Sequence, residues 1–331
     1  YNLQFSAYAQ YYKDFSETQH FDIMAGYEWQ HFYNDYYNIG NGFYRDTNND
    51  PEKRGTKYPE SESSSKTESY IVSFFGRANY IGWNQLMLTA TVRADGSSRF
   101  APEHRWGIFP SVALGWKIKE TFLQDVNEIN DLKLRLGYGI TGQQETGLGD
   151  YPYMATYTIS QDHAYYPIGG EENMLLDKEG NPVKDSNGNQ LYTTYRPNAF
   201  NRYLTWEKTT TYNAGIDFGF LNNRVSGSID YYFRQTDDLL NTIPVAVGTN
   251  FRNKVISNVG SLNNQGVEFA INAVAIDKKN FKWDLGFNIT YNENKITKLN
   301  TGEDQTPIPV GGISCGTGNT IQRHAVGYPA Y

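Results

Sequence analysis

Apolar and polar residues alternate with a period of two in ten stretches of this chain. In the clearest stretch, Leu3 and Phe5 are separated by Gln4, and the alternation continues to residue 12. Because successive side chains of a strand point to opposite faces, this pattern predicts strands with one apolar and one polar face. The ten predicted strands cover residues 2–12, 21–29, 70–80, 86–93, 106–117, 132–140, 212–218, 225–234, 267–273 and 283–291.

The apolar positions of these ten stretches hold no Asp, Glu, Lys or Arg. Charges fall on the opposite positions, and those expected to face a barrel lumen are Arg77, Arg93, Lys133, Arg135, Asp217, Asp230, Arg234 and Glu268. A Lys or Arg on the lipid face of a membrane barrel costs about 2–4 kcal/mol at the bilayer midplane. The distribution therefore favours strands that face lipid on one side, with structural pairing among the charges on the other.

Strand and connection lengths separate a membrane barrel from a soluble β-sandwich, which also alternates. Measured from one connection to the next, the predicted strands run to about 10–14 residues, enough to cross a bilayer at a tilt, whereas ordinary strands average about 5–6. Short and long connections also alternate, as in up-and-down outer-membrane barrels with periplasmic turns and extracellular loops. The short ones are 13–17, 82–84, 119–130, 221–223 and 277–280, and the long ones 33–67, 95–104, 143–203 and 237–262. Pro110 lacks a ladder donor, which predicts a bulge there.

Composition agrees with an all-β, antiparallel, up-and-down transmembrane barrel segment. Aromatic residues make up 15% of the chain, including 27 Tyr, and such barrels place Tyr and Trp at both membrane interfaces. The net charge of -7, without a long basic tract, excludes a nucleic-acid partner. Cys315 has no second cysteine to pair with, and no run of 18 apolar residues forms a transmembrane helix.

No catalytic or cofactor motif in the sequence has the neighbouring residues or structure that its chemistry requires, so we expect neither an enzyme nor a bound cofactor or metal. The G-x-G-x-x-G at 137–142 is not followed by a helix start for a pyrophosphate. Three Asp- and Asn-rich clusters, at 46–50, 177–181 and 185–189, lack EF-hand spacing and favour turns over a calcium site in a loop. The five histidines lack H-E-x-x-H spacing.

Tyrosines are concentrated in the predicted loop 143–203, where a ligand could be bound. A tyrosine ring packs against the C–H face of a sugar while its hydroxyl forms a hydrogen bond. Membrane-interface and loop packing account for most of these tyrosines. The substrate-binding hypothesis is therefore restricted to Tyr165 and Tyr166, which lie farthest in sequence from the predicted strand ends.

Several stretches taken together resemble one known family. They are SFFGRANY (73–80), LTATVRADGSSRF (88–100), RWGIFPS (105–111), 132–142, LTWEK (204–208), 222–232, TDDLL (236–240) and 258–268, with VGYP (326–329) similar to the start of a further segment. This pattern is similar to the barrel of the SusC/RagA family of TonB-dependent outer-membrane transporters. The resemblance spans nearly the whole chain outside the long loops.

The resemblance implies a plugged barrel of about 22 strands in the bacterial outer membrane. It implies active import of large nutrients, chiefly oligosaccharides and in some members oligopeptides. The implied partners are a SusD-like surface lipoprotein and the TonB complex, reached through an N-terminal region outside this sequence. Residues 1–331 are then expected to be a partial barrel domain, with the plug, TonB box and closing strands elsewhere. A passive porin or a surface adhesin remains the alternative.

Overall fold

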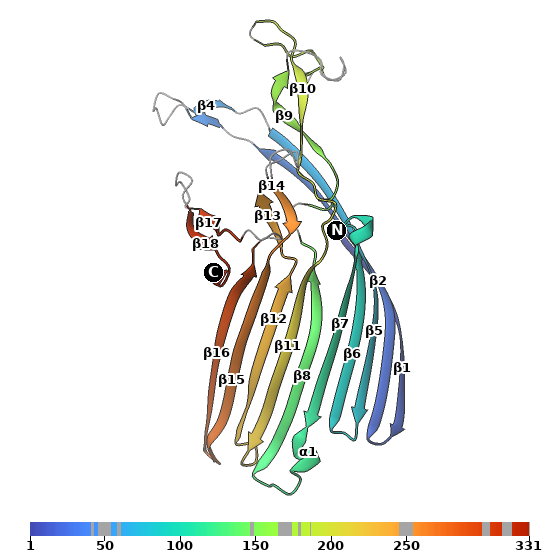
Figure 1. The fold of residues 1–331 in the computed structure, drawn as a ribbon, viewed down its shortest axis with the longest axis vertical. Coiled ribbons are helices and arrows are strands. Elements are labelled where there is room, and N and C mark those ends of the chain that lie inside the picture. Colours follow the sequence, from blue (N-terminus) through green and yellow to red (C-terminus); the bar gives the residue numbers. More distant parts are fainter. Residues whose placement is uncertain are drawn as a thin grey trace.

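Ten long strands form one antiparallel sheet in the computed structural model of the chain (Figure 1). The structure describes residues 1–40, 43–45, 54–57, 61–145, 149–164, 174–177, 180–185, 187–244, 254–299, 305–312 and 320–330. The strands of the sheet are β1 (Asn2–Ser16), β2 (Gln19–Gly40), β5 (Ser61–Gly82), β6 (Leu86–Ser97), β7 (Trp106–Lys117), β8 (Ile129–Gln143), β11 (Glu207–Phe220), β12 (Val225–Asp237), β15 (Ser261–Lys278) and β16 (Phe281–Lys298).

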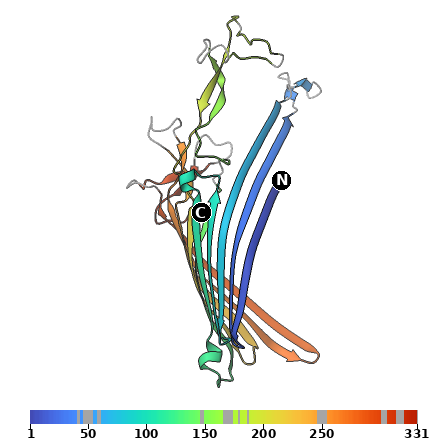
Figure 2. The ribbon, with the colours of Figure 1, turned by 90° about the vertical axis from the view of Figure 1, so that its right-hand side faces the viewer.

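Each strand between the two edges of this sheet pairs with the sheet strand before it and the one after it, so the order is up-and-down, as the sequence predicts. β1 and β16 form the two edges, and the sheet is open, curved and twisted in the two perpendicular views (Figures 1 and 2). The predicted ten-strand count is confirmed. Among the described residues, no helix is long and apolar enough to cross a bilayer.

The connections divide between the two ends of the sheet, here called the turn end and the loop end (Figure 1). Tight turns and the short helix α1 (Ile118–Phe122) lie at the turn end. Trp83, Asn84 and residues 221–223 adopt positive φ in these turns, a conformation that asparagine tolerates better than most residues. The 3-10 helix η1 (Pro102–His104) and small hairpins lie at the loop end: β3 (Phe43–Arg45) with β4 (Arg54–Lys57), β9 (Tyr157–Ala164) with β10 (Tyr192–Pro197), β13 (Leu240–Pro244) with β14 (Lys254–Asn258), and β17 (Ile308–Gly312) with β18 (Thr320–His324).

The predicted loop 33–67 is the first correction. β2 and β5 each have 22 residues, and their ladder continues without interruption to the pair Gly40–Ser61. Residues 34–38 and 64–68 are mostly polar on both faces, so the alternation of apolar residues stops while the backbone pairing goes on. A hairpin that extends beyond a bilayer needs no apolar face, so the alternation of apolar residues could not reveal the outer part of this ladder.

The bulge predicted at Pro110 is the second correction. Pro110 pairs with Val92 in an unbroken β6–β7 ladder. Pairing of β7 with β8 instead begins at Ser111–Gly139, one residue after the proline. A proline cannot donate to a ladder, and here the β7–β8 ladder ends beside it rather than accommodating an extra residue.

A small buried core lies where β7 and β8 separate at the loop end. It consists of Phe100, Phe109, Leu204 and Trp206 and is here called the mouth cluster. The Trp206 indole Nε1 donates to the Arg105 carbonyl at 2.8 Å, and the rings of Phe100 and Phe109 lie 5.4 Å and 5.3 Å from that of Trp206. Because these residues come from two connections and one strand, the mouth cluster holds the bases of the loops on the sheet.

Candidate functional site

The ladder register places all eight charges predicted to face a lumen on one face of the sheet, here called the polar face. Arg93 pairs with Phe75, two residues from Arg77 in β5. Lys133 pairs with Asp217, and Asp230 pairs with Glu268. Paired residues in a ladder share a face, so charges from six strands line one surface.

The opposite, apolar face is exposed across the whole sheet. Its exposed members include Leu3, Phe5, Ile23, Phe74, Val92, Ile108, Val112, Leu136, Ile216, Ile229, Val267 and Ile289. A monomeric water-soluble protein rarely exposes an apolar patch of more than a few hundred Å². The fold thus separates a charged surface from a surface that requires an apolar environment.

Arg135 lies at the centre of a three-strand charge network on the polar face. Its guanidinium donates to both Asp217 oxygens, with Nε–Oδ2 at 2.9 Å and Nη2–Oδ1 at 2.8 Å, and its Nη2 also lies 2.8 Å from Oδ1 of Asp230. Arg135, Gly215 and Asp230 are consecutive ladder partners on β8, β11 and β12. A Cβ on Gly215 would lie 2.2 Å from Asp230 Oδ1, so the glycine is what lets the arginine reach across β11.

Arg93 forms a second network nearer the β1 edge. Its guanidinium donates to Glu28, Asp95 and Ser73 at 2.9, 2.7 and 2.8 Å. The Glu28 carboxylate also accepts a 2.6 Å hydrogen bond from Gln4 and is almost fully buried. The structural pairing expected among the polar-face charges is thus found for Arg93 and for the Arg135 group, whereas Arg234 instead lies over the Tyr232 ring, 5.1 Å from its centroid.

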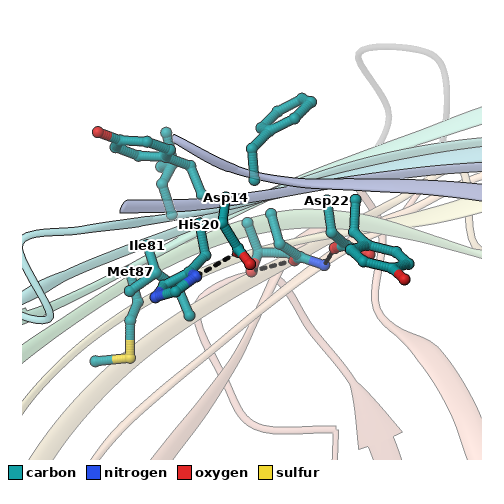
Figure 3. A pocket seen from close by; sticks show the side chains of 11 residues that line it. Asp14, His20, Asp22, Ile81 and Met87 are labelled. Carbon is teal, nitrogen blue, oxygen red and sulfur yellow. Dashed lines mark hydrogen bonds and ion pairs between the residues drawn. The ribbon is translucent and has the colours of Figure 1, made fainter. Parts of the chain in front are cut away.

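A cavity of about 460 Å³ opens on the polar face near the turn end (Figure 3). Figure 3 shows Asp14 and His20 joined by a hydrogen bond of 2.6 Å, with Asp22 farther along the wall. Asp22 accepts hydrogen bonds from Gln10 and Asn79. The side chains of His20 and Asp14 are 40% and 68% exposed, and ion pairs this open contribute little to stability.

Nothing in the described ranges supplies a metal site. No three His, Cys, Asp or Glu side chains there lie close enough together to hold an ion. Among the described residues of the clusters at 177–181 and 185–189, Gly180 and Gly188 lie at φ +85°, and their backbone N–H groups donate to the carbonyls of Asp177 and Asp185 at 3.1 Å, as in turns. Asp185 Oδ1 accepts hydrogen bonds from the backbone N–H groups of Asn189 and Asn187, and these bonds, that of Asn189 most, lower the pKa of the Asp185 carboxyl. The cluster at 46–50 lies outside the described residues.

The remaining sequence candidates have different outcomes. The G-x-G-x-x-G at 137–142 lies within β8, where it pairs with β11 throughout and with β7 up to Gly139, so it is strand and not the start of a helix. Tyr165 and Tyr166 lie outside the described residues. Glu28, Ser73 and Gln4, which complete the Arg93 network, were not predicted. Only the ladder register brings Glu28, 65 positions away in sequence, to the Arg93 guanidinium, and Gln4 in turn to Glu28.

Aromatic rings border the apolar face toward both ends. Toward the loop end, His31 stacks on Tyr70 with centroids 4.4 Å apart, and Trp29 lies 6.2 Å from the same tyrosine ring. At the turn end, the rings of Trp116 and Phe122 are 5.5 Å apart. Membrane barrels carry such aromatic belts at both interfaces, where an amphipathic ring suits the headgroup region.

Comparisons with known proteins agree with this geometry. Residues 1–326 match the family model described as TonB dependent receptor-like, beta-barrel. The chain is 48% identical, over all its length and 31% of the relative, to TonB-dependent receptor SusC of Bacteroides thetaiotaomicron. It is also 31% identical to TonB-dependent receptor P39 of Formosa agariphila, and this match covers 97% of the present chain and 28% of P39.

Among solved structures, the fold is similar to the RagAB peptide transporter. The TM-score is 0.75 with 26% sequence identity, and the match covers 99% of this chain and 32% of that one. The chain therefore spans about a third of the length of these two relatives and of this solved structure.

Proposed function

The chain belongs to the TonB-dependent receptor-like β-barrel family of the bacterial outer membrane, and from this premise we propose that it forms part of an importer of large nutrients. The nutrients are oligosaccharides, and import is energised through TonB. In this proposal residues 1–331 are a partial barrel domain, and the plug, TonB box and closing strands belong to the rest of the protein. A SusD-like surface lipoprotein is the proposed partner at the cell surface.

The observation that carries the proposal is the division of one continuous ten-strand sheet into two faces. The apolar face, bordered by aromatic rings, is proposed to contact lipid, and the polar face with its Arg93 and Arg135 networks is proposed to line the lumen. The turn end is then periplasmic and the loop end extracellular, following the usual arrangement of short turns and long loops. No chemistry beyond binding and passage is assigned to these residues.

Oligosaccharides are favoured over oligopeptides by the stronger sequence similarity. Identity is 48% to SusC and 26% to the structure of a peptide transporter, and the SusC/RagA resemblance implies oligosaccharides for most members. Peptide import is the second candidate, because the peptide transporter shares the fold along 99% of the chain.

Uptake of labelled hexasaccharides and hexapeptides by cells that produce the full-length transporter tests the proposal. We expect hexasaccharide uptake that falls to the level of a transporter-deletion strain when the tonB gene is deleted or the proton-motive force is dissipated. Uptake that persists without TonB would indicate a passive porin, and surface binding without uptake an adhesin. Uptake of the peptide alone would replace the proposed substrate class.

A further inference from the structure

A cavity of about 470 Å³ lies at the loop end, between the segment 151–156, residues 198–199 and the β13–β14 hairpin. Its lining residues are Tyr151, Pro152, Met154, Thr156, Asn198, Ala199, Thr242, Lys254, Val255 and Ile256. Ligand-binding pockets in proteins usually measure about 300–1,000 Å³, so the size suits a small part of a larger ligand.

The cavity is built on the mouth cluster rather than on free loops. Ile256 packs directly against that cluster. Asn201 connects two walls of the cavity. Its backbone N–H donates to the Pro152 carbonyl at 3.4 Å, and its side-chain Nδ2 donates to the Ile256 carbonyl at 3.0 Å. Arg99 holds Asp150, next to the first wall residue, at 3.3 Å. A site whose walls are already fixed loses little entropy when a ligand binds.

The lining combines apolar residues with residues that carry hydroxyl or ammonium groups. Pro152 and Val255 are buried, whereas Met154 is 50% exposed. Thr156, Thr242 and Lys254 are exposed and carry hydroxyl and ammonium groups. None of the ten lining residues is acidic. Such a lining fits a ligand with apolar C–H faces and many hydroxyls, and offers no carboxylate to a peptide amino terminus.

Two lining residues have hydrogen-bonding groups in a suitable state. A tyrosine phenol is protonated at neutral pH, and burial, followed by the nearby Glu68 carboxylate, raises the pKa of Tyr151 further. Thr156 Oγ1 accepts a hydrogen bond from Asn198 Nδ2 at 3.1 Å, which orients the threonine hydroxyl so that its own proton can be donated to a ligand.

We propose that this cavity is an extracellular subsite for a neutral oligosaccharide, with one sugar against the Tyr151 ring and its hydroxyls bonded to Thr156, Thr242 and Lys254. The proposal deepens the proposed function and rests on it for the substrate class and for the extracellular side. The hypothesis that Tyr165 and Tyr166 bind substrate is separate and stays a prediction, because both residues lie outside the described residues.

Calorimetric titration of the full-length transporter in detergent with maltohexaose, cellohexaose, xylohexaose and hexaalanine tests the subsite. We expect at least one hexasaccharide to bind, and Tyr151→Leu and Thr242→Val each to weaken its affinity by about tenfold. The matched control is Tyr203→Leu, because Tyr203 is 79% exposed at the same end and does not line the cavity. Thr242→Val changes only a hydroxyl on an exposed residue, so it tests the site even where Tyr151→Leu disturbs folding.

The subsite would be overturned if Thr242→Val and a correctly folded Tyr151→Leu both bound the hexasaccharide with unchanged affinity. It would also be overturned if Tyr203→Leu lost as much affinity as the two cavity variants. Binding of hexaalanine alone, or of none of the four probes, would overturn it as well. Uptake by cells separates this failure from that of the proposed function. If TonB-dependent hexasaccharide uptake persists while both cavity variants bind normally, only the subsite is wrong. If the wild-type transporter takes up no hexasaccharide, the substrate class itself is wrong.

Discussion

Arg135 connects three strands by binding two carboxylates, so its removal should lower the free energy of unfolding. Asp217 and Asp230 each lie within 3 Å of the guanidinium, and the side chain of Asp230 is only 15% exposed. In Arg135→Met the two carboxylates lose their shared cation in a half-buried position. We expect a loss of about 1–3 kcal/mol in the free energy of unfolding, measured by urea denaturation of the full-length protein in detergent.

The matched variant Arg135→Met/Asp217→Asn/Asp230→Asn removes both charges with the cation. It should recover most of the lost stability, because neutral amides leave no uncompensated charge in the network. Equal stability of the wild type and Arg135→Met would mean that water or mobile counter-ions screen the carboxylates. The network would then contribute nothing measurable to the free energy of unfolding.

At the scale of a strand, adjacent positions in β15 should differ sharply in what they tolerate. Phe269 belongs to the apolar face and contacts Phe287 of β16, with centroids 6.5 Å apart, whereas Glu268 belongs to the polar face opposite Asp230. Phe269→Arg should impair folding into membranes by about 2–4 kcal/mol if the site is near the midplane, because it places a cation in lipid.

Glu268→Gln should insert normally, since it only removes a charge from the polar face. Heat-modifiable mobility of outer-membrane fractions on gels measures the folded fraction of each variant. Equal tolerance of the two substitutions would contradict the assignment of the apolar face to lipid. The same strands would then belong to a soluble sandwich.

At the scale of the whole molecule, the ten-strand sheet has two open edges and an exposed apolar face. Within the described chain β1 pairs only with β2, and β16 only with β15. Unpaired edges and large apolar surfaces both promote association. Residues 1–331 produced alone should therefore aggregate in water and disperse only in detergent, as measured by size-exclusion chromatography with light scattering. A water-soluble monomer with a cooperative melt would contradict the membrane-barrel fold.

Alternation along the sequence by itself determined the strands and their faces, because strand geometry converts period two directly into sidedness. It placed residues such as Arg135, Asp230 and Glu268 on one face before any pairing was known, and the register confirmed this. It could not determine the length of β2 and β5, because their outer halves are polar on both faces and nothing in the periodicity marks where pairing ends.

Only the tertiary structure decided which distant residues meet. Arg135 reaches Asp230 across Gly215 because three strands share one register, and the sequence separation of 95 residues gives no hint of it. The loop-end cavity likewise joins Tyr151 to Lys254 through loops that the mouth cluster holds together. Local patterning fixes the direction in which a side chain points, whereas proximity depends on ladder register and on core packing between segments far apart in the chain.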